Sequence, residues 1–223
     1  LGAISSRTVA NQEDGASGVA GVYPNDGSKG PYLMAANGVE YMQLVEKGLM
    51  CAVFMNQMTQ NYLANIGDDD NEVISDAGAG KHYTSMEHHW DEAYGYYTSQ
   101  VDFPASGTDR FWGKYSNKRE GVLESNTKIA MAFRKGRAAI SNKDYPVRDA
   151  QVNIINTEIE KVCAGTAIHY LNAAKAGIGD GTARNHQLSE AWAFIGGLEY
   201  GANSINGNSI SKADIDAAYE HIG

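Results

Sequence analysis

Two segments of this chain share one pattern of residues. The first, MEHHWDEAYGYY, covers residues 86–97, and the second, RNHQLSEAWAFIGG, covers residues 184–197. In each, a histidine is followed four residues later by a glutamate, then by alanine, an aromatic residue, a small residue and a second aromatic residue. The histidines are His88 and His186, so the copies are 98 residues apart. A self-similarity of this kind predicts a chain built from two related halves.

The segments that precede the two copies also resemble each other. Glu46 and Lys47 in VEKGLMCA correspond to Glu160 and Lys161 in IEKVCAGT. The first half has a longer acidic loop, GDDDNEVISDAGAGK, which accounts for the different spacing. We therefore predict a duplicated helical unit, with repeats at about residues 32–103 and 120–223, whose halves pack around a pseudo-two-fold axis.

Apolar residues along the chain recur at the helical intervals of three and four. The first long helix has a predicted core-facing stripe of Met42, Val45, Leu49, Ala52, Val53 and Met55. The sequence has no convincing alternating pattern of strands, so the predicted fold class is all-α. Residues 1–31, rich in Gly, Ser, Asn and Asp, are predicted to form an extended entry segment, and residues 32–223 a single helical domain.

Charge and hydropathy exclude some classes of partner. The 223 residues carry a formal net charge of −9, so the basic surface expected of a nucleic-acid-binding protein is missing. No run of eighteen apolar residues occurs, which predicts no membrane span in this chain. The chain begins at Leu1 without a signal-peptide pattern, which is compatible with a processed or proteolysed product and leaves export open.

The two cysteines, Cys51 and Cys163, lie in apolar helical segments. Neither has the close Cys or His spacing of a zinc knuckle. Buried free thiols are the simpler interpretation, and a disulfide between the two is the alternative.

The matched helices are predicted to have two distinct faces, because successive helical residues are about 100° apart. One face of each helix has the His/Glu pair followed by small residues: His88, Glu92, Gly95 and Ser99 in the first, and His186, Glu190, Ala193 and Gly197 in the second. The opposite face has the large side chains that predict a core stripe: Met86, Trp90, Tyr94 and Tyr97, and then Leu188, Trp192 and Ile195.

Small residues on the His/Glu faces predict that these faces are also covered, since glycine in an exposed helix costs roughly 1 kcal/mol relative to alanine. A buried glutamate beside a neutral histidine must be paired, protonated or bound to a cation. If the two faces oppose each other, a metal site is predicted, with water completing the coordination of iron, zinc or manganese. Its ligands would be His88, His89, Glu92, His186 and Glu190. The alternative is a pair of His/Glu hydrogen bonds inside a helix interface.

Other candidate sites are weaker. In AFRKGRAAI, Arg134 and Arg137 flank one side of a helix, as a solvated face or as an anion clamp. GDDDNE lacks the glycine and the terminal glutamate of an EF-hand loop, so a surface loop is predicted. No hydrolase, phosphate-loop, dinucleotide or His-Glu-x-x-His motif is present, and we assign no catalytic residue.

The segments YLMAANGVEYMQLVEKGLM, MEHHWDEAYGYY, RFWGKY, AFRKGRAAI and HQLSEAWAFIGGL together resemble a family of uncharacterised bacterial lipoproteins of the cell envelope. That family is similar in turn to the imelysin-like, or iron-regulated-protein-A-like, proteins, which are all-helical, built from two related bundles and marked by a Gly-x-His-x-x-Glu signature. Here HWDE matches its second part, Glu87 stands in place of the glycine, and the second copy has one residue more between His186 and Glu190. The resemblance implies an exported, periplasmic or cell-surface protein, a lipoprotein of the outer membrane.

Three functions are compatible with these patterns. The first is a non-enzymatic envelope protein that binds a divalent metal ion, iron or zinc, or a metal-bearing ligand between its halves, in iron acquisition. The second is a structural or adaptor subunit of an outer-membrane protein complex, in which the His/Glu pairs only hold the fold. The third is a metallopeptidase, in which a glutamate would act as the general base on a metal-bound water.

Overall fold

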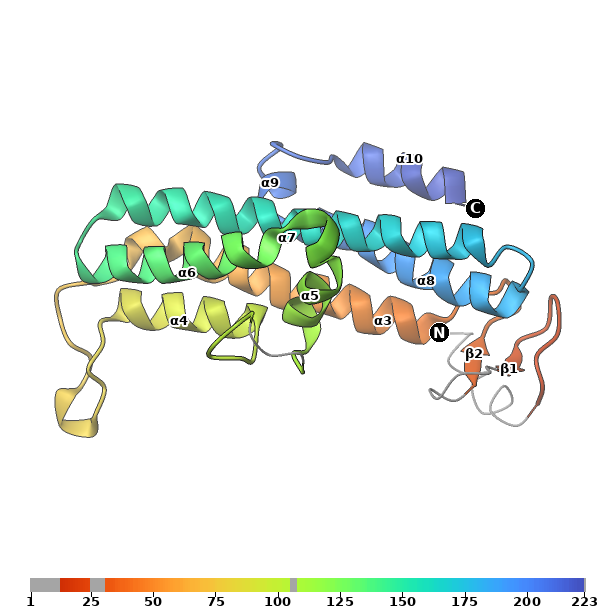
Figure 1. The fold of residues 1–223 in the computed structure, drawn as a ribbon, viewed down its shortest axis with the longest axis horizontal. Helices are drawn as coiled ribbons and strands as arrows, with labels where there is room; N and C mark the ends of the chain where they lie inside the picture. The colour runs from red at the N-terminus through yellow and green to blue at the C-terminus, as the bar shows by residue number, and fades with distance from the viewer. Residues whose placement is uncertain (1–12, 25–30, 105–107, 223) are drawn as a thin grey trace.

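The structure, a computed structural model, describes residues 13–24, 31–104 and 108–222. These residues form eight α-helices, short π- and 3₁₀-helical segments, and one two-stranded sheet. The prediction of an all-α protein is confirmed, and Figure 1 shows an elongated helical bundle.

Two long helical elements run in opposite directions along the molecule (Figure 1). The first begins as α3 (Tyr41–Leu49) and continues through the π-helical segments η1 (Met50–Met55) and η2 (Gln57–Leu63). The second is α7 (Tyr145–Ala176), whose 32 residues span about 48 Å at 1.5 Å per residue. The Asp144 side chain caps the start of α7 by accepting a hydrogen bond from the Val147 amide.

Shorter helices pack at the two ends of these long elements. At one end, α4 (Ser85–Tyr97) packs on η2, and α6 (Ser125–Ser141) packs on α4 and α7. At the other end, α8 (Gly181–Gly197) packs on α3 and α7. Near the middle, α5 (Phe111–Leu123) packs on α7, and α10 (Lys212–Ile222) covers α8 after the short helix α9 (Ala202–Ile205). The remaining elements are 3₁₀ turns: η3 (Ile66–Asp68), η4 (Ala77–Ala79) and η5 (Leu198–Tyr200).

A small antiparallel sheet precedes the bundle. Strands β1 (Gly21–Tyr23) and β2 (Tyr32–Met34) pair with Val22 opposite Leu33, close to the start of α3. The sequence pattern missed these strands because three residues are too few to show an alternating period. Of the entry segment predicted over residues 1–31, positions 1–12 and 25–30 lie outside the described residues.

The core at the α4 end agrees with the sequence. Trp90 is 1% exposed, its indole Nε1 donates a hydrogen bond to the Phe133 carbonyl at 2.9 Å, and Met86 and Tyr97 on the same face are also buried. The predicted large-residue face of α4 is therefore confirmed as the core face. Tyr94, at the edge of that face, is half-buried against Phe133.

The orientation of α3 contradicts the sequence prediction. Four members of the predicted core stripe are exposed: Met42 by 63%, Val45 by 58%, Leu49 by 55% and Val53 by 47%. The buried face of α3 instead holds Gln43 and Lys47, which have polar partners inside the bundle. Only Met55, in the π-helical segment that follows, is buried as predicted. Tertiary polar contacts therefore decide which side of α3 faces inward.

Two helix glycines provide a matched test of this packing. Gly136 of α6 lies against the Trp90 indole, and a methyl group there would overlap the ring. We expect Gly136→Ala to lower the free energy of unfolding by about 1–3 kcal/mol, because neither the ring nor the helix can move freely. Gly95 of α4 is exposed with open space beside it, so Gly95→Ala should raise that free energy by about 0.5–1 kcal/mol. Urea unfolding of both variants measures these values, and equal effects would contradict the packing described.

Candidate functional site

The second His/Glu pair lies in a buried polar cluster between α3 and α8. The His186 Nδ1 atom lies 2.5 Å from the Glu40 Oε2 atom, and its Nε2 atom lies 3.4 Å from the Glu190 Oε1 atom. All three side chains are at least nine-tenths buried. The Nδ1 contact with Glu40 is a hydrogen bond, and Glu190 lies beside the other ring nitrogen.

Glu40 is the member of this cluster that sequence reasoning missed. It is the residue before α3, its Oε1 atom accepts a hydrogen bond from Gln43 at 3.0 Å, and its amide donates to the Ser189 hydroxyl at 2.9 Å. The carboxylate thus ties the start of α3 to α8. The sequence does show that Glu40 is an acidic residue at the start of a helix, where acidic residues are favoured. It does not show which residue Glu40 contacts.

An aromatic ring closes the cluster. Tyr32 of β2 stacks on the His186 imidazole with the ring centroids 4.2 Å apart and the planes within 7°. The N-terminal sheet therefore contributes directly to the environment of the second motif, although the sequence gives no sign of this contact.

Behind Glu190, a chain of polar groups leads toward the middle of the bundle. Burial, then the charge of Glu190, raises the pKa of the Tyr170 phenol, which also interacts with Tyr115. Burial lowers the pKa of the Lys47 ammonium, but Tyr115, Glu190 and Glu46 together outweigh burial, so the net shift of the pKa is upward. The Tyr170 hydroxyl is close to Glu190, yet the Glu190 Oε2 atom accepts no well-formed hydrogen bond within the described part of the chain.

The first His/Glu pair is much more exposed. The His88 Nε2 atom lies 3.2 Å from the Glu92 Oε1 atom, with side chains 44% and 37% exposed. A Tyr ring stacks on this histidine too: Tyr83 lies 4.8 Å from it between centroids. Burial, and then a hydrogen bond to Glu92, raises the pKa of the Tyr62 phenol. A reciprocal capping box between Thr84 and Glu87 fixes the start of α4 and with it the position of these side chains.

His89 joins the same end of the molecule through the acidic loop. Its Nδ1 atom lies 2.8 Å from the Asp69 Oδ2 atom, and its ring centroid lies 6.0 Å from that of His88. Asp69 was read from the sequence only as part of a surface loop. The pattern could not show that the loop turns back onto α4.

The structure does not bring the two His/Glu pairs together. α4 follows the first long element after the acidic loop, and α8 follows α7 after a short turn. Because the two long elements are antiparallel, α4 and α8 lie at opposite ends of the bundle (Figure 1). The predicted convergence of His88, His89 and Glu92 with His186 and Glu190 is therefore wrong. Within residues 13–24, 31–104 and 108–222, no three His, Cys, Asp or Glu side chains are arranged to hold a metal ion.

The faces of α8 differ from those predicted. The His/Glu side is the more deeply buried one, and Gly197 on it lies against the Cys51 and Cys163 side chains, where a methyl group would overlap sulfur. Of the predicted core face, Ile195 is buried as predicted, whereas Leu188 and Trp192 are only half-buried, and Trp192 stacks on Tyr219 of α10 at 4.3 Å. α8 is covered on both sides because α10 adds a layer that the pattern did not reveal. Both cysteines are buried free thiols, which confirms the simpler interpretation.

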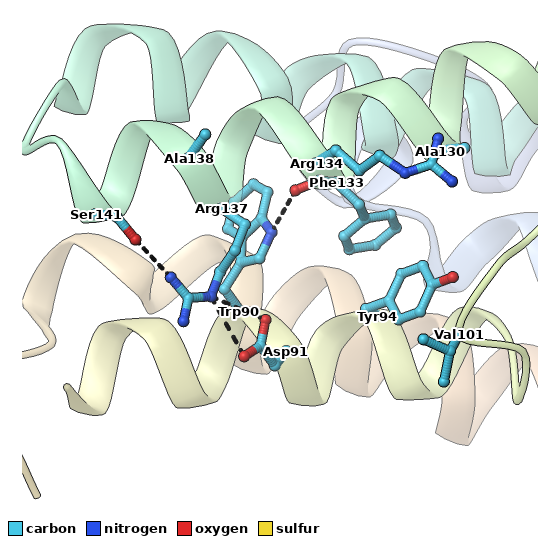
Figure 2. Close-up of a pocket in the computed structure, with 10 residues that line it drawn as sticks. All are labelled: Trp90, Asp91, Tyr94, Val101, Ala130, Phe133, Arg134, Arg137, Ala138 and Ser141. Atoms are coloured by element: carbon cyan, nitrogen blue, oxygen red, sulfur yellow. Dashed lines mark hydrogen bonds and ion pairs between the residues drawn. The ribbon is translucent and has the colours of Figure 1, made fainter. Parts of the chain in front are cut away.

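The two arginines of AFRKGRAAI border a cavity of about 420 Å³ between α4 and α6. Figure 2 shows Arg137 reaching across to Asp91 and Ser141 beside the aromatic floor of Trp90, Tyr94 and Phe133. The Arg137 Nη1 atom also lies 2.6 Å from the Glu87 Oε1 atom. The Arg137 guanidinium therefore forms salt bridges with two carboxylates of α4, those of Glu87 and Asp91. Arg134 donates to the Phe103 carbonyl at 2.9 Å. These contacts do not support an anion clamp formed by both arginines.

The geometry therefore defines an all-α bundle with one buried and one exposed His/Glu cluster. No helix in the described part of the chain is long and apolar enough to span a bilayer. The chain belongs to the DUF4856 family, a domain of unknown function whose family model matches residues 2–222. No curated protein and no solved structure matches the chain.

The different burial of the two clusters predicts different contributions to stability. Glu40→Gln should lower the free energy of unfolding by about 2–3 kcal/mol, because it weakens a buried charge-assisted contact. Glu92→Gln makes the same chemical change in the exposed pair and should cost less than about 1 kcal/mol. Urea denaturation of the two variants provides the comparison. Equal losses would show that the burial of the two clusters has been assigned wrongly.

Proposed function

We propose that this protein is a non-enzymatic, partner-binding protein of the cell envelope, whose contact surface is the exposed apolar face of α3. The observation that carries the proposal is the exposure of Met42, Val45 and Leu49 of α3, together with Val53 of η1, along one face of the first long helical element. Contiguous exposed apolar patches on soluble proteins often mark interaction sites, whereas single exposed residues are ordinary. The location in the envelope rests on the resemblance of the motif segments.

The packing of α3 supports this proposal. The helix is anchored by Glu40 and by the buried polar residues Gln43 and Lys47, so the fold does not need its apolar face. Four large apolar residues on that face have no evident structural task. In an adaptor these residues would form the binding surface, because a partner helix can pack against apolar side chains spaced at helical intervals.

A cross-linking experiment tests the contact surface. A photo-reactive amino acid at position 49, introduced in cells into the full chain, should cross-link a defined protein that mass spectrometry identifies. The matched control is position 122, because Val122 is 86% exposed and lies at the end of α5 away from Phe111, Lys114 and Tyr115, the α5 residues that approach α3. Leu49→Gln should leave the unfolding free energy within about 0.5 kcal/mol while abolishing cross-linking from position 45. Identical products from positions 49 and 122, or none from 49, would refute the adaptor role.

A specific observation favours a second candidate, a divalent-cation site at the α4 end. His88 with Glu92 and His89 with Asp69 form two neighbouring His/carboxylate pairs there, with the two imidazole centroids 6.0 Å apart. All four side chains are partly exposed, and they would have to rotate to surround one ion. Imidazole and carboxylate together suit iron or zinc. The iron-acquisition role implied by the imelysin-like resemblance would then use the first motif alone, with the buried second motif holding the fold.

The like surroundings of the two motifs support the proposal that the halves are a duplicated unit. In both, a Tyr ring stacks on the histidine, a glutamate follows at the fourth position, and a Tyr of the adjoining long element approaches that glutamate. The stacked rings come from different segments, Tyr83 from just before α4 and Tyr32 from β2. The halves are therefore proposed to have diverged in how deeply they bury the motif.

Calorimetry and elemental analysis test the cation site. Protein purified without chelator should carry iron or zinc, and the His88→Gln/His89→Gln double variant should lose it. The control is His169→Gln/His221→Gln, which changes two exposed histidines, one in α7 and one in α10. A parent protein that binds neither ion, or a double variant that binds as well as the parent, would remove this candidate. A protease assay on unfolded substrate with the same samples addresses the metallopeptidase alternative.

A further inference from the structure

A second cavity lies near the middle of the bundle, between α3 and the beginning of α5. Its volume is about 280 Å³, and its lining is Glu46, Lys47, Met50, Arg110, Phe111, Lys114 and Tyr115. It belongs to neither His/Glu cluster. The cavity is small for a drug-sized ligand, which limits its occupant to a small molecule or to one group of a larger one.

The charges around this cavity are strongly unbalanced. Three cationic side chains, Lys47, Arg110 and Lys114, face one carboxylate, that of Glu46, in a chain whose formal net charge is −9. The Lys47 Nζ atom lies 2.9 Å from the Glu46 Oε2 atom, but Glu46 is 57% exposed and free to turn toward solvent. The cavity therefore concentrates positive charge on an otherwise acidic protein.

Lys47 is a fixed part of this cavity. It is only 5% exposed, and Tyr115 and Glu190 hold it from the interior. Burial lowers the pKa of the ammonium, but these two groups and Glu46 raise it by more, so Lys47 is charged at neutral pH. A buried, immobilised ammonium loses less side-chain entropy on binding an anion than a surface lysine does.

Arg110 and Lys114 complete the cationic lining from α5. Arg110 is the residue before α5 and has extended backbone, and its carbonyl accepts a hydrogen bond from the Lys114 amide at 3.2 Å, so both residues border the cavity at the start of α5. Neither side chain forms a salt bridge with the described residues, and the Lys114 Nζ atom lies 5.5 Å above the Tyr115 ring. Both are exposed and remain available to a ligand.

Phe111 forms the apolar rim of the cavity in a strained backbone conformation. Its φ of 47° is in the left-handed region, which bulky residues rarely adopt, and its ring packs edge-on against Phe54 at 4.8 Å. The contact with Phe54 places the start of α5, and so Arg110, beside η1.

We propose that this cavity binds a small phosphate-type oxyanion through Lys47, Arg110 and Lys114. A doubly charged anion matches the excess of positive charge better than a monocarboxylate does. The Arg110 guanidinium can donate two parallel hydrogen bonds to phosphate oxygens, and the lysines contribute point charges. The ligand is inorganic phosphate or the phosphate group of a phosphomonoester.

Isothermal titration calorimetry of the full chain at low ionic strength tests the proposal with inorganic phosphate, glycerol phosphate and succinate as probes. The parent should bind both phosphates more tightly than succinate, and binding of inorganic phosphate alone would identify the free ion as the ligand. Arg110→Gln/Lys114→Gln should weaken phosphate binding roughly tenfold or more. The charge-matched control, Lys135→Gln/Lys175→Gln, removes two exposed lysines elsewhere and should bind within about twofold of the parent.

A variant that is expected to bind phosphate more tightly distinguishes binding at this site from damage to the fold. Glu46→Gln removes the one carboxylate of the cavity and should tighten phosphate binding, with an unchanged melting temperature for the ligand-free protein. The proposal is overturned if the parent binds no phosphate, if the control pair loses as much affinity as the cavity pair, if Glu46→Gln weakens binding, or if succinate binds and phosphate does not.

Discussion

The contact between the Glu40 carboxylate and the His186 imidazole fixes how the first long helix sits in the bundle. Both groups are buried, so separating them would leave a polar or charged group without compensation. The same carboxylate holds Gln43, and the same side of α3 carries Lys47 four residues later. With this side turned inward, the apolar residues of α3 face outward. The proposed partner surface and the position of Lys47 in the cationic cavity both follow from that one orientation.

The two copies of the motif show how surroundings determine the role of the same residues. In α4 the His/Glu pair is near solvent, beside a loop that adds Asp69. In α8 the equivalent pair is covered by α3, by the Tyr32 ring and by the layers around α8. The first pair can change its contacts at little cost in free energy, because both side chains are exposed. The second pair is buried, and its contacts stabilise the fold. A ligand-binding role therefore fits the first copy and a structural role fits the second.

The sequence predicts the helical elements and the core around Trp90 well, because large apolar residues at helical intervals have few alternatives to burial. It fails for α3, where an equally regular stripe is exposed. The reason is that Glu40 and Lys47 have polar partners on distant segments, His186 for Glu40 and Tyr115 for Lys47, and periodicity contains no information on such partners. The prediction that the two motifs converge is wrong for a topological reason. The spacing of the motifs indicates two halves, but it does not show whether the two motif helices meet at the centre of the molecule or lie at its opposite ends. The sequence does not predict the roles of Glu40 and Asp69, because their contacts with His186 and His89 arise only from the tertiary structure.

The orientation of α3 can be measured directly by thiol labelling. Cys51 and Cys163 are buried, so the native chain provides a low background. Cysteine introduced at Val45, which is 58% exposed, should react with a thiol reagent in the folded protein as fast as an unfolded control. Cysteine introduced at Gln43, which is 6% exposed, should react only after unfolding. Fast labelling at position 43 together with protection at position 45 would show that the apolar face is inward, and would contradict the buried polar anchoring of α3.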